Sequence, residues 1–339
     1  MKFGCMIPTC TAGIAYDEPS LTTHGAIIRI AKAAEDLGFD SIWGNEHVVT
    51  PNYLADVPSH ARNFYESLMT LSYLAAITNR VGLGSCVVPL ALRNPVIIAK
   101  QAVTLDVLSG GRMILGVGLG AYKEEFQIAK SFVPLNERTR MYDENLRALR
   151  ALLDEPKASF SGKHVKFSEV EIHPKPIQKP FPIYVGGNSE MAIRRAAEYG
   201  QGWIPASPTP EEVRNAVEKL KKLTKDSGRG YSQIEVCPQT TGCLQQSREE
   251  AFRKFRASLS YRHFISLRDS TFRHDPNYMR SVEERRPIGN PDDILRKIEK
   301  LVDAGITHFI MAFIAENLDD LVNSMELFAQ EVMPSFRHK

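Results

Sequence analysis

The residues best suited to acid–base chemistry are Glu46 and His47, which follow a short apolar segment at 41–43. A histidine can donate or accept a proton near neutral pH, and an adjacent carboxylate can hold the imidazole or contact a ligand. A lone histidine in a loop is more often an ordinary polar surface group, so this interpretation depends on the fold around it. We take Glu46 and His47 as catalytic candidates if the fold brings that strand end to a site.

Gly116, Gly118 and Gly120 form a glycine-rich segment after the apolar stretch 113–117. Glycines permit positive φ and let the backbone approach a flat ligand closely. A turn without a ligand is the alternative. With Ala121 the segment also matches the G-x-G-x-x-G/A dinucleotide fingerprint, although a Rossmann unit would place this fingerprint at the start of its domain.

A second glycine loop, Gly186-Gly187-Asn188-Ser189, precedes a predicted helix at 190–199. The N–H groups at the start of a helix bind anions, and phosphate is the usual occupant. The loop contains no lysine or arginine, so a phosphate there would depend on backbone and hydroxyl donors. The alternative is that Asn188 or Ser189 only caps the helix.

Several reactive motifs are absent from the sequence. It contains no P-loop, no HExxH and no G-x-S-x-G segment. Carboxylates and histidines do not cluster at predicted strand ends beyond Glu46 and His47, so we expect no metal site. Because the chain brings little reactive chemistry of its own, a bound organic cofactor is favoured.

The elements that must position these residues alternate along the chain. Predicted strands lie at 2–8, 41–43, 81–88, 113–117, 183–185, 203–204, 234–238 and 307–313. Predicted helices lie at 25–37, 66–78, 95–108, 136–153, 190–199, 210–225, from 248 onward, 291–303 and 318–332. About eight strand–helix units predict an α/β protein with a (β/α)8 TIM barrel, whose reactive groups gather at the C-terminal mouth. A doubly wound open sheet is the alternative.

Two stretches interrupt the alternation within what we expect to be a single barrel domain over 1–339. Residues 157–180 alternate like a hairpin and then become proline-rich, which predicts an insertion between strands four and five. Residues 253–286 are rich in Arg, His, Tyr and Phe and precede the last strand–helix unit. We expect a helical, lid-like segment or an oligomer contact there, because no RNA-binding signature accompanies it.

The composition is 43% hydrophobic and 24% charged, with a net charge of +2. This balance is typical of a soluble globular protein and gives no field that would attract nucleic acid or an acidic membrane. No segment approaches the roughly 18 apolar residues of a membrane span, and residues 1–8 make a poor signal peptide. Five cysteines form no CxxC pair, so we expect a cytoplasmic protein.

Together these segments resemble the bacterial luciferase-like superfamily, which consists of flavin- or deazaflavin-dependent (β/α)8 barrels. The resemblance covers most of the chain and rests on segments 1–4, 38–47, 81–88, 108–120, 174–180 and 182–189. It implies that His47 lies beside the reactive edge of the cofactor ring, with Glu46 near the ring. Ser85, Cys86 and Val87 would form a third-strand bulge, with a non-prolyl cis peptide between Cys86 and Val87.

The resemblance also implies how the rest of the cofactor is held. Gly116, Gly118 and Gly120 would line its side chain, and Tyr122 belongs to the same predicted cofactor-binding set. The loop Gly186-Gly187-Asn188-Ser189 would receive its phosphate.

Coenzyme F420 is the cofactor that the resemblance favours over FMN. In luciferase an arginine on the fourth-strand loop meets the FMN phosphate, whereas Leu119 occupies that place here, and the glycine-rich loop is similar to that of F420-dependent enzymes. A reduced deazaflavin has carbon in place of flavin N5, so it delivers hydride and does not form the oxygen adduct that monooxygenation needs. Related dehydrogenases that act on glucose 6-phosphate carry an acid where Ala121 stands, so that substrate is not predicted.

We therefore predict an oxidoreductase that transfers hydride between coenzyme F420 and a small organic substrate, with His47 as proton donor or acceptor. An FMN-dependent monooxygenase, an NAD(P)-dependent dehydrogenase and a non-catalytic flavin-binding protein are the alternatives. We expect loops 48–65 and 253–286 to form the substrate pocket. The resemblance implies a homodimer.

Overall fold

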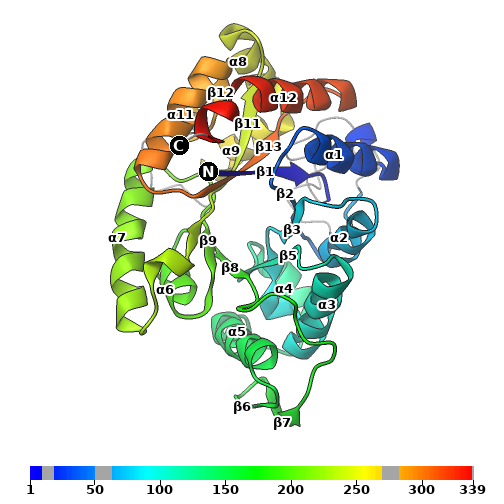
Figure 1. Ribbon diagram of the computed structural model, residues 1–339, viewed down its shortest axis with the longest axis vertical. Helices are drawn as coiled ribbons and strands as arrows, with labels where there is room; N and C mark the ends of the chain where they lie inside the picture. The colour runs from blue at the N-terminus through cyan, green and yellow to red at the C-terminus, as the bar shows by residue number, and fades with distance from the viewer. Residues whose placement is uncertain (10–18, 50–62, 269–281, 338–339) are drawn as a thin grey trace.

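The computed structural model describes residues 1–9, 19–49, 63–268 and 282–337, and in them eight strand positions form a parallel barrel (Figure 1). The strands of its wall are β1 (Lys2–Ile7), β2 (Ser41–Gly44), β3 (Gly82–Ser85) with β4 (Val88–Pro89), β5 (Met113–Gly118), β8 (Ile183–Gly186), β9 (Gly202–Ile204), β10 (Glu235–Val236) with β11 (Gln239–Leu244), and β13 (His308–Phe313). Neighbouring wall strands pair in parallel. The predicted (β/α)8 architecture is confirmed.

The barrel closes through its seventh strand, which is divided into β10 and β11. β10 pairs with β9 and β11 pairs with β13, so this one stretch of chain joins the two ends of the sheet. At the break, Cys237 N donates to a β9 carbonyl at 2.9 Å, and Pro238 O accepts from Ile310 N of β13 at 2.9 Å. The division falls at Pro238, which has no N–H to donate. The strand predicted at 234–238 therefore continues through β11.

Outer helices surround the wall (Figure 1). They are α1 (His24–Asp36), α2 (Ser67–Ala75), α3 (Pro95–Leu108), α5 (Arg138–Asp154), α6 (Glu190–Tyr199), α7 (Pro210–Asp226), α11 (Pro291–Asp303) and α12 (Leu318–Glu331). Capping boxes open α7, with Thr209 and Glu212, and α11, with Asn290 and Asp293. No helix among the described residues is long and apolar enough to cross a membrane.

The remaining elements decorate the barrel. They are α4 (Lys123–Ala129), the hairpin of β6 (Ala158–Ser161) and β7 (Lys166–Val170), α8 (Arg248–Ala257), α9 (Leu259–Arg268), β12 (Ile288–Gly289), α13 (Pro334–Arg337), and the 3-10 turns η1 (Pro19–Thr22), η3 (Leu90–Leu92), η4 (Leu135–Glu137) and η5 (Tyr231–Gln233). The hairpin lies between α5 and β8, as the predicted insertion requires, and projects from the barrel in Figure 1. The segment 253–286 is helical as far as Arg268, and its residues 269–281 lie outside the described part.

A polar cluster fills the end of the barrel interior opposite the mouth. Trp43 Nε1 donates to Ser41 Oγ at 2.7 Å, and that hydroxyl lies 2.9 Å from His308 Nε2. Glu235 is 3.4 Å from His308 Nδ1 and forms an ion pair with Lys2. Burial opposes ionisation of Glu235, but the neighbouring His308, Lys2 and Tyr184 groups lower its pKa to about 2. The cluster therefore contains an ionised, partnered carboxylate.

We predict that Glu235→Gln destabilises the fold by about 2 kcal/mol at neutral pH, since it removes a charged hydrogen-bond acceptor. A carboxylate whose folded pKa is lowered stabilises the fold above its ordinary pKa of 4.5, and this contribution disappears as the pH falls towards 2. Urea unfolding of the variant and the wild type should therefore show a stability gap that narrows below pH 4.5. A gap independent of pH would contradict the assignment.

Candidate active site

His47 stands just beyond the carboxyl end of β2, at the mouth of the barrel, and its side chain is only 12% exposed. Its Nδ1 lies 3.2 Å from Glu125 Oε2, and the other oxygen of that carboxylate accepts from Val48 N at 2.8 Å. The imidazole also packs against the rings of Tyr122 and Phe64, at centroid distances of 5.3 and 6.0 Å. Glu125 of α4, the preceding Tyr122 and Phe64 together surround the histidine and restrict its orientation.

Glu46 is directed into an ion-pair cluster. Arg93 Nε donates to Glu46 Oε1 at 2.9 Å, a second guanidinium nitrogen reaches the same oxygen, and Arg93 also lies 3.2 Å from Glu66. Burial raises the pKa of Glu46, while the Arg93 charge opposes that rise. Asn145 Nδ2 donates to the Arg93 carbonyl at 3.0 Å and so fixes the arginine backbone. The Glu46 carboxylate is therefore engaged by Arg93, and its catalytic role stays a prediction.

The third wall strand is interrupted at the mouth between β3 and β4, where the Cys86–Val87 peptide is cis, as the resemblance implied. The strand predicted over 81–88 is therefore divided. Cys86 N donates to the Gly44 carbonyl at 2.7 Å, and Ser85 Oγ donates to the Gly116 carbonyl at 2.9 Å. Ser85 and Cys86 are buried, whereas Val87 is only partly buried. Of these three predicted cofactor contacts, Val87 is the one with its side chain accessible.

Glycines of two neighbouring strands make room for this bulge. A Cβ on Gly118 would fall 2.5 Å from Val87 Cγ2, and one on Gly186 would fall 2.8 Å from Val87 Cγ1. A Cβ on Gly116 would fall 1.9 Å from the Ser85 carbonyl oxygen. The sequence did not reveal this packing role, and whether these glycines also line a cofactor stays a prediction. The Val87 side chain forms an apolar platform shared by three strands.

The second glycine loop is braced by its own side chains. Asn188 Nδ2 donates to the Ala206 carbonyl at 2.9 Å, and Ala206 N donates back to Asn188 Oδ1 at 2.7 Å. Ser189 is the N-cap of α6 and accepts from Ala192 N, as the capping alternative predicted. Gly187 has a φ of +125°, which favours glycine. The remaining donors for an anion here are the first backbone N–H groups of α6.

The described part of segment 253–286 approaches the same mouth. Burial, reinforced by the charges of Arg286 and His47, lowers the pKa of His263 in α9 to about 4. The Arg286 guanidinium lies 3.5 Å from the centroid of the Phe264 ring. A neutral imidazole and a stacked cation therefore lie on the lid side of the site.

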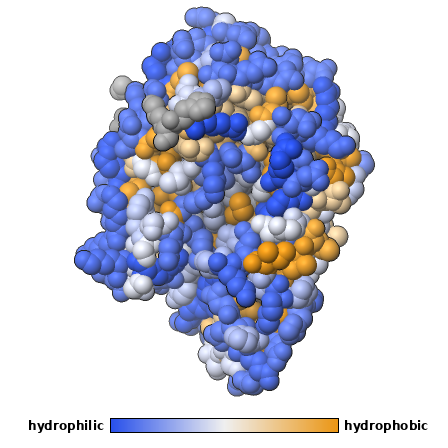
Figure 2. Space-filling model, viewed as in Figure 1, coloured by the Kyte–Doolittle hydropathy of each residue, from blue (hydrophilic) through white to orange (hydrophobic). Residues whose placement is uncertain are grey.

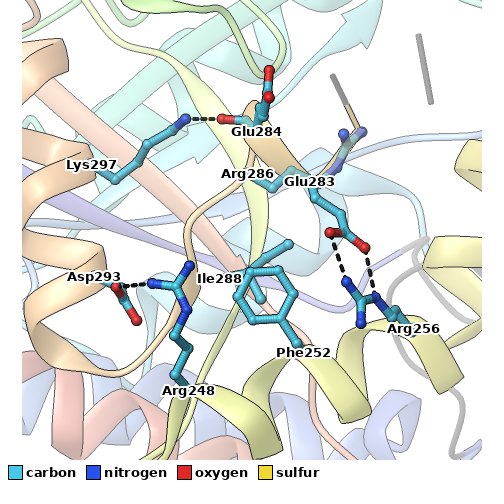
Figure 3. A pocket seen from close by; sticks show the side chains of 9 residues that line it. All are labelled: Arg248, Phe252, Arg256, Glu283, Glu284, Arg286, Ile288, Asp293 and Lys297. Atoms are coloured by element: carbon cyan, nitrogen blue, oxygen red, sulfur yellow. Dashed lines mark hydrogen bonds and ion pairs between the residues drawn. The ribbon is translucent and has the colours of Figure 1, made fainter. Parts of the chain in front are cut away.

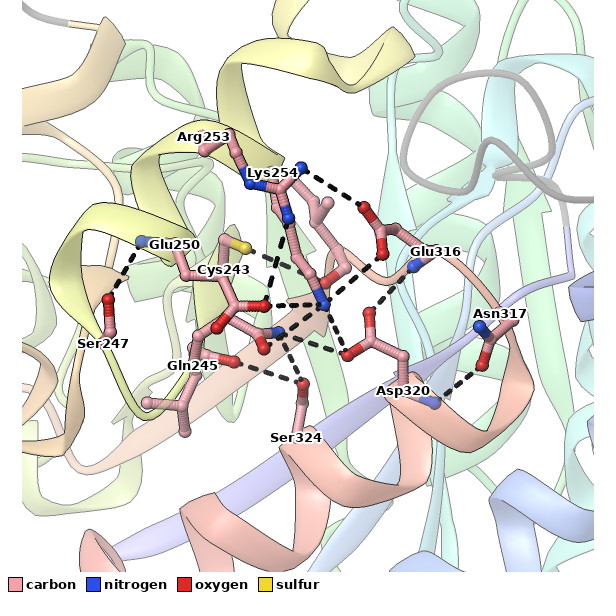
Figure 4. Close-up of polar contacts among 12 residues, drawn as sticks. Cys243, Gln245, Ser247, Glu250, Arg253, Lys254, Glu316, Asn317, Asp320 and Ser324 are labelled. Atoms are coloured by element: carbon pink, nitrogen blue, oxygen red, sulfur yellow. Dashed lines mark hydrogen bonds and ion pairs between the residues drawn. The ribbon is translucent and has the colours of Figure 1, made fainter.

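Ion pairs fix the base of this lid (Figure 4). Lys254 of α8 is buried, and its Nζ lies 2.9 Å from Asp320 of α12 and 3.3 Å from Gln245 Oε1. Glu316 and Glu250 lie within 4 Å of the same ammonium. Because a buried ammonium is costly unless it is paired, this cluster ties α8 to α12.

A separate pocket of about 530 Å³ opens between α8, α11 and the segment before β12 (Figure 3). Its charged walls are paired with each other, Arg248 with Asp293 at 2.5 Å and Arg256 with Glu283 at 2.7 Å. Arg286, which stacks on Phe264 at the lid side of the site, also lines this pocket, whereas none of the predicted catalytic or cofactor-binding residues does. Among the described residues no His, Cys, Asp and Glu side chains gather in a way that could hold a metal ion.

Comparison of the sequence with known protein families agrees with this fold. The family model of the luciferase-like monooxygenases matches residues 1–308. The chain belongs to this family. This luciferase-like protein is 27% identical over 328 residues to an F420-dependent glucose-6-phosphate dehydrogenase of Kineococcus radiotolerans, covering 92% of this chain and 93% of that protein.

Two further likenesses cover nearly whole chains. A 5,10-methylenetetrahydromethanopterin reductase of Methanopyrus kandleri is 24% identical over 95% of this luciferase-like protein and 96% of its own length. The crystal structure of the monooxygenase RslO1 from Streptomyces bottropensis superposes with a TM-score of 0.81 at 22% identity, covering 99% of this chain and 100% of that chain. The luciferase-like fold is thus shared at low identity.

Three site residues of this luciferase-like protein escaped sequence analysis. Glu125 is 78 positions away from the histidine that it contacts, and Arg93 is 47 positions away from Glu46. His263 lies in a segment without a recognisable motif. Only the strand end after β5, which precedes Glu125, could have indicated that a carboxylate reaches the mouth.

We predict that Gly118→Ala lowers the unfolding temperature, because the new Cβ overlaps Val87 and overpacking costs about 1–3 kcal/mol. The double variant Gly118→Ala, Val87→Ala should recover most of this loss, since it removes the overlapping methyl groups. Gly25→Ala is the matched control, because a Cβ there meets nothing within 4 Å. Differential scanning fluorimetry measures all three variants. Equal losses for the Gly118 single and double variants would contradict the packing role.

Proposed function

We propose that this chain is a coenzyme F420-dependent oxidoreductase that transfers hydride between the deazaflavin and a small organic substrate. The observation that carries the proposal is an imidazole held by Glu125 at the barrel mouth that also contains the Val87 platform. The relative from Kineococcus, named as F420-dependent, supports the choice of cofactor.

The residues present fit a planar tricyclic group. Val87 occupies the space that side chains at Gly118 and Gly186 would fill, so three strand ends share one low apolar surface. A flat ring needs such a surface. Phosphate would be held by the first N–H groups of α6, because the Asn188 and Ser189 side chains already have partners within the protein.

When bound, the deazaflavin would supply or accept the hydride. The residues of the protein would bind and orient the cofactor and the substrate, and one of them would transfer the proton. Val87 supports the ring, and His47 takes or gives the proton that accompanies hydride transfer at the substrate. The partly buried His263 and the Phe264–Arg286 pair would cover the lid side of the site. A protein contributes to cofactor chemistry by fixing the orientation of the reactants and by excluding water from them.

Titration of the purified protein with F420, FMN and NADPH, monitored by fluorescence, tests which cofactor it uses. We predict that F420 binds most tightly. His47→Ala should keep that affinity and lower turnover about 10²- to 10⁴-fold on a panel of alcohols, ketones and enones. His173→Ala is the matched control, because His173 is 66% exposed on the insertion.

Preference for FMN with oxygen consumption would instead support a monooxygenase, and binding of NADPH alone would support a nicotinamide dehydrogenase. Reduced F420 that no substrate in the panel oxidises would favour a binding protein without turnover. Unchanged turnover in His47→Ala would remove this histidine from the mechanism.

We further propose that the protein forms a homodimer through α2 and α3. Met69 and Tyr73 on α2 are 66% and 44% exposed, and Ile97 on α3 is 56% exposed. Figure 2 shows hydrophobic residues gathered over these helices on the right of the view. A helix that is apolar on its outer face as well as its inner face is usually covered by a partner. A two-fold dimer would cover the same surface on both copies.

Light scattering after size exclusion tests this surface, and we predict a wild-type particle of twice the monomer mass. The double variant Met69→Glu, Ile97→Glu should be monomeric, because it places charges at the contact. Phe132→Glu is the control, since Phe132 is fully exposed outside these helices. A monomeric wild type, or a dimeric double variant, would contradict the proposal.

A further inference from the structure

Each oxygen of the Glu125 carboxylate faces one group of the loop that follows β2. Its side chain is 3% exposed, Oε2 lies 3.2 Å from His47 Nδ1, and Oε1 accepts from Val48 N at 2.8 Å. The contact joins α4, which follows the glycine-rich loop, to the loop after β2. Two mouth segments far apart in sequence are thus connected through one carboxylate.

This geometry restricts the protonation of the imidazole. An ionised carboxylate only accepts hydrogen bonds, so the Nδ1 that faces it must carry a proton. In the neutral ring Nε2 is then the acceptor. The tautomer of His47 follows from its partner.

We propose that Glu125 is a positioning residue that holds His47 as the Nδ1–H tautomer, so that Nε2 exchanges the proton in the reaction. The inference rests on the proposed function for the identity of that reaction. When substrate carbon bearing a hydroxyl loses hydride to the cofactor, the hydroxyl proton moves to Nε2 and a C=O bond forms. The resulting imidazolium donates through Nδ1 to Glu125, a charge-assisted hydrogen bond that stabilises it.

A purely structural role is the competing explanation. In that case Glu125 serves only to tie down Val48 N at the start of the loop, and its contact with the imidazole is incidental. The two explanations differ in what an amide at this position would do. A glutamine can still accept from Val48 N through its oxygen, but its NH2 group would face Nδ1 and donate.

Glu125→Gln is therefore the decisive variant, because it keeps shape and the loop contact while reversing the hydrogen bond to His47. Nitrogen-15 NMR of histidine-labelled protein, with the signal assigned through His47→Ala, should show Nδ1–H in the wild type and Nε2–H in the variant. Turnover should fall at least about 10-fold, as loss of an orienting partner typically costs. Affinity for F420 should stay within about 2-fold, since Glu125 acts through the histidine.

The pH profile of turnover provides a second readout. Glu125→Gln removes the negative charge that faces the imidazolium formed during turnover, so the pH profile of the variant should differ from that of the wild type. Glu124→Gln, the neighbouring substitution on α4, is the control and should change neither tautomer nor profile.

An Nε2–H tautomer in the wild type, or an unchanged tautomer and turnover in Glu125→Gln, would overturn the proposal. The tautomer is measured by NMR without substrate, so this result does not depend on the enzyme being active. Failure of the wild type to bind F420 would refute the proposed function and leave the tautomer result standing.

Discussion

Parallel pairing around a closed ring is the constraint on which the site depends. Because each wall strand runs in the same direction as its neighbours, the ends of β2, β3, β5 and β8 meet at one rim. The seventh strand completes the ring although Pro238 interrupts it, since the carbonyl and amide groups on either side still pair with β9 and β13. Closure of the sheet curves this edge into a mouth, whereas an open sheet would leave the same strand ends along an open edge.

The rim combines an apolar packing contact with two histidines. Val87 lies where Gly118 and Gly186 have no side chain, and this contact defines the floor. His47 stands beside it, held through Nδ1 by Glu125. On the other side α9 contributes a histidine whose pKa is lowered by burial and by nearby positive charge. The site therefore combines an apolar floor with two imidazoles, of which His47 faces a carboxylate and His263 lies near positive charge.

The sequence predicted those parts that depend on local pattern. The strand at 307–313 and the helix at 318–332 agree closely with β13 and α12, because apolar periodicity marks both. β11 was missed because its polar start, Gln239–Thr241, becomes a strand only through pairing with β13.

The same distinction holds within the site. His47 was recognisable because it directly follows a strand, whereas Glu125 resembles any carboxylate at the start of a helix until the fold brings it to the imidazole. Asn188 was correctly located in a loop before α6, but its bonds to Ala206 depend on the neighbouring strand end. Contacts between segments far apart in sequence have no local signature.

The segment with Gly116, Gly118 and Gly120 lies directly before α4 in the sequence, and this closeness has a consequence for substitutions there. The stretch from Gly116 to Glu125 supplies both the gaps that receive Val87 and the carboxylate that orients the imidazole. A single insertion or exchange in this stretch would alter both the packing around Val87 and the contact that holds His47. The packing at Val87 and the environment of His47 therefore cannot be changed independently through this stretch.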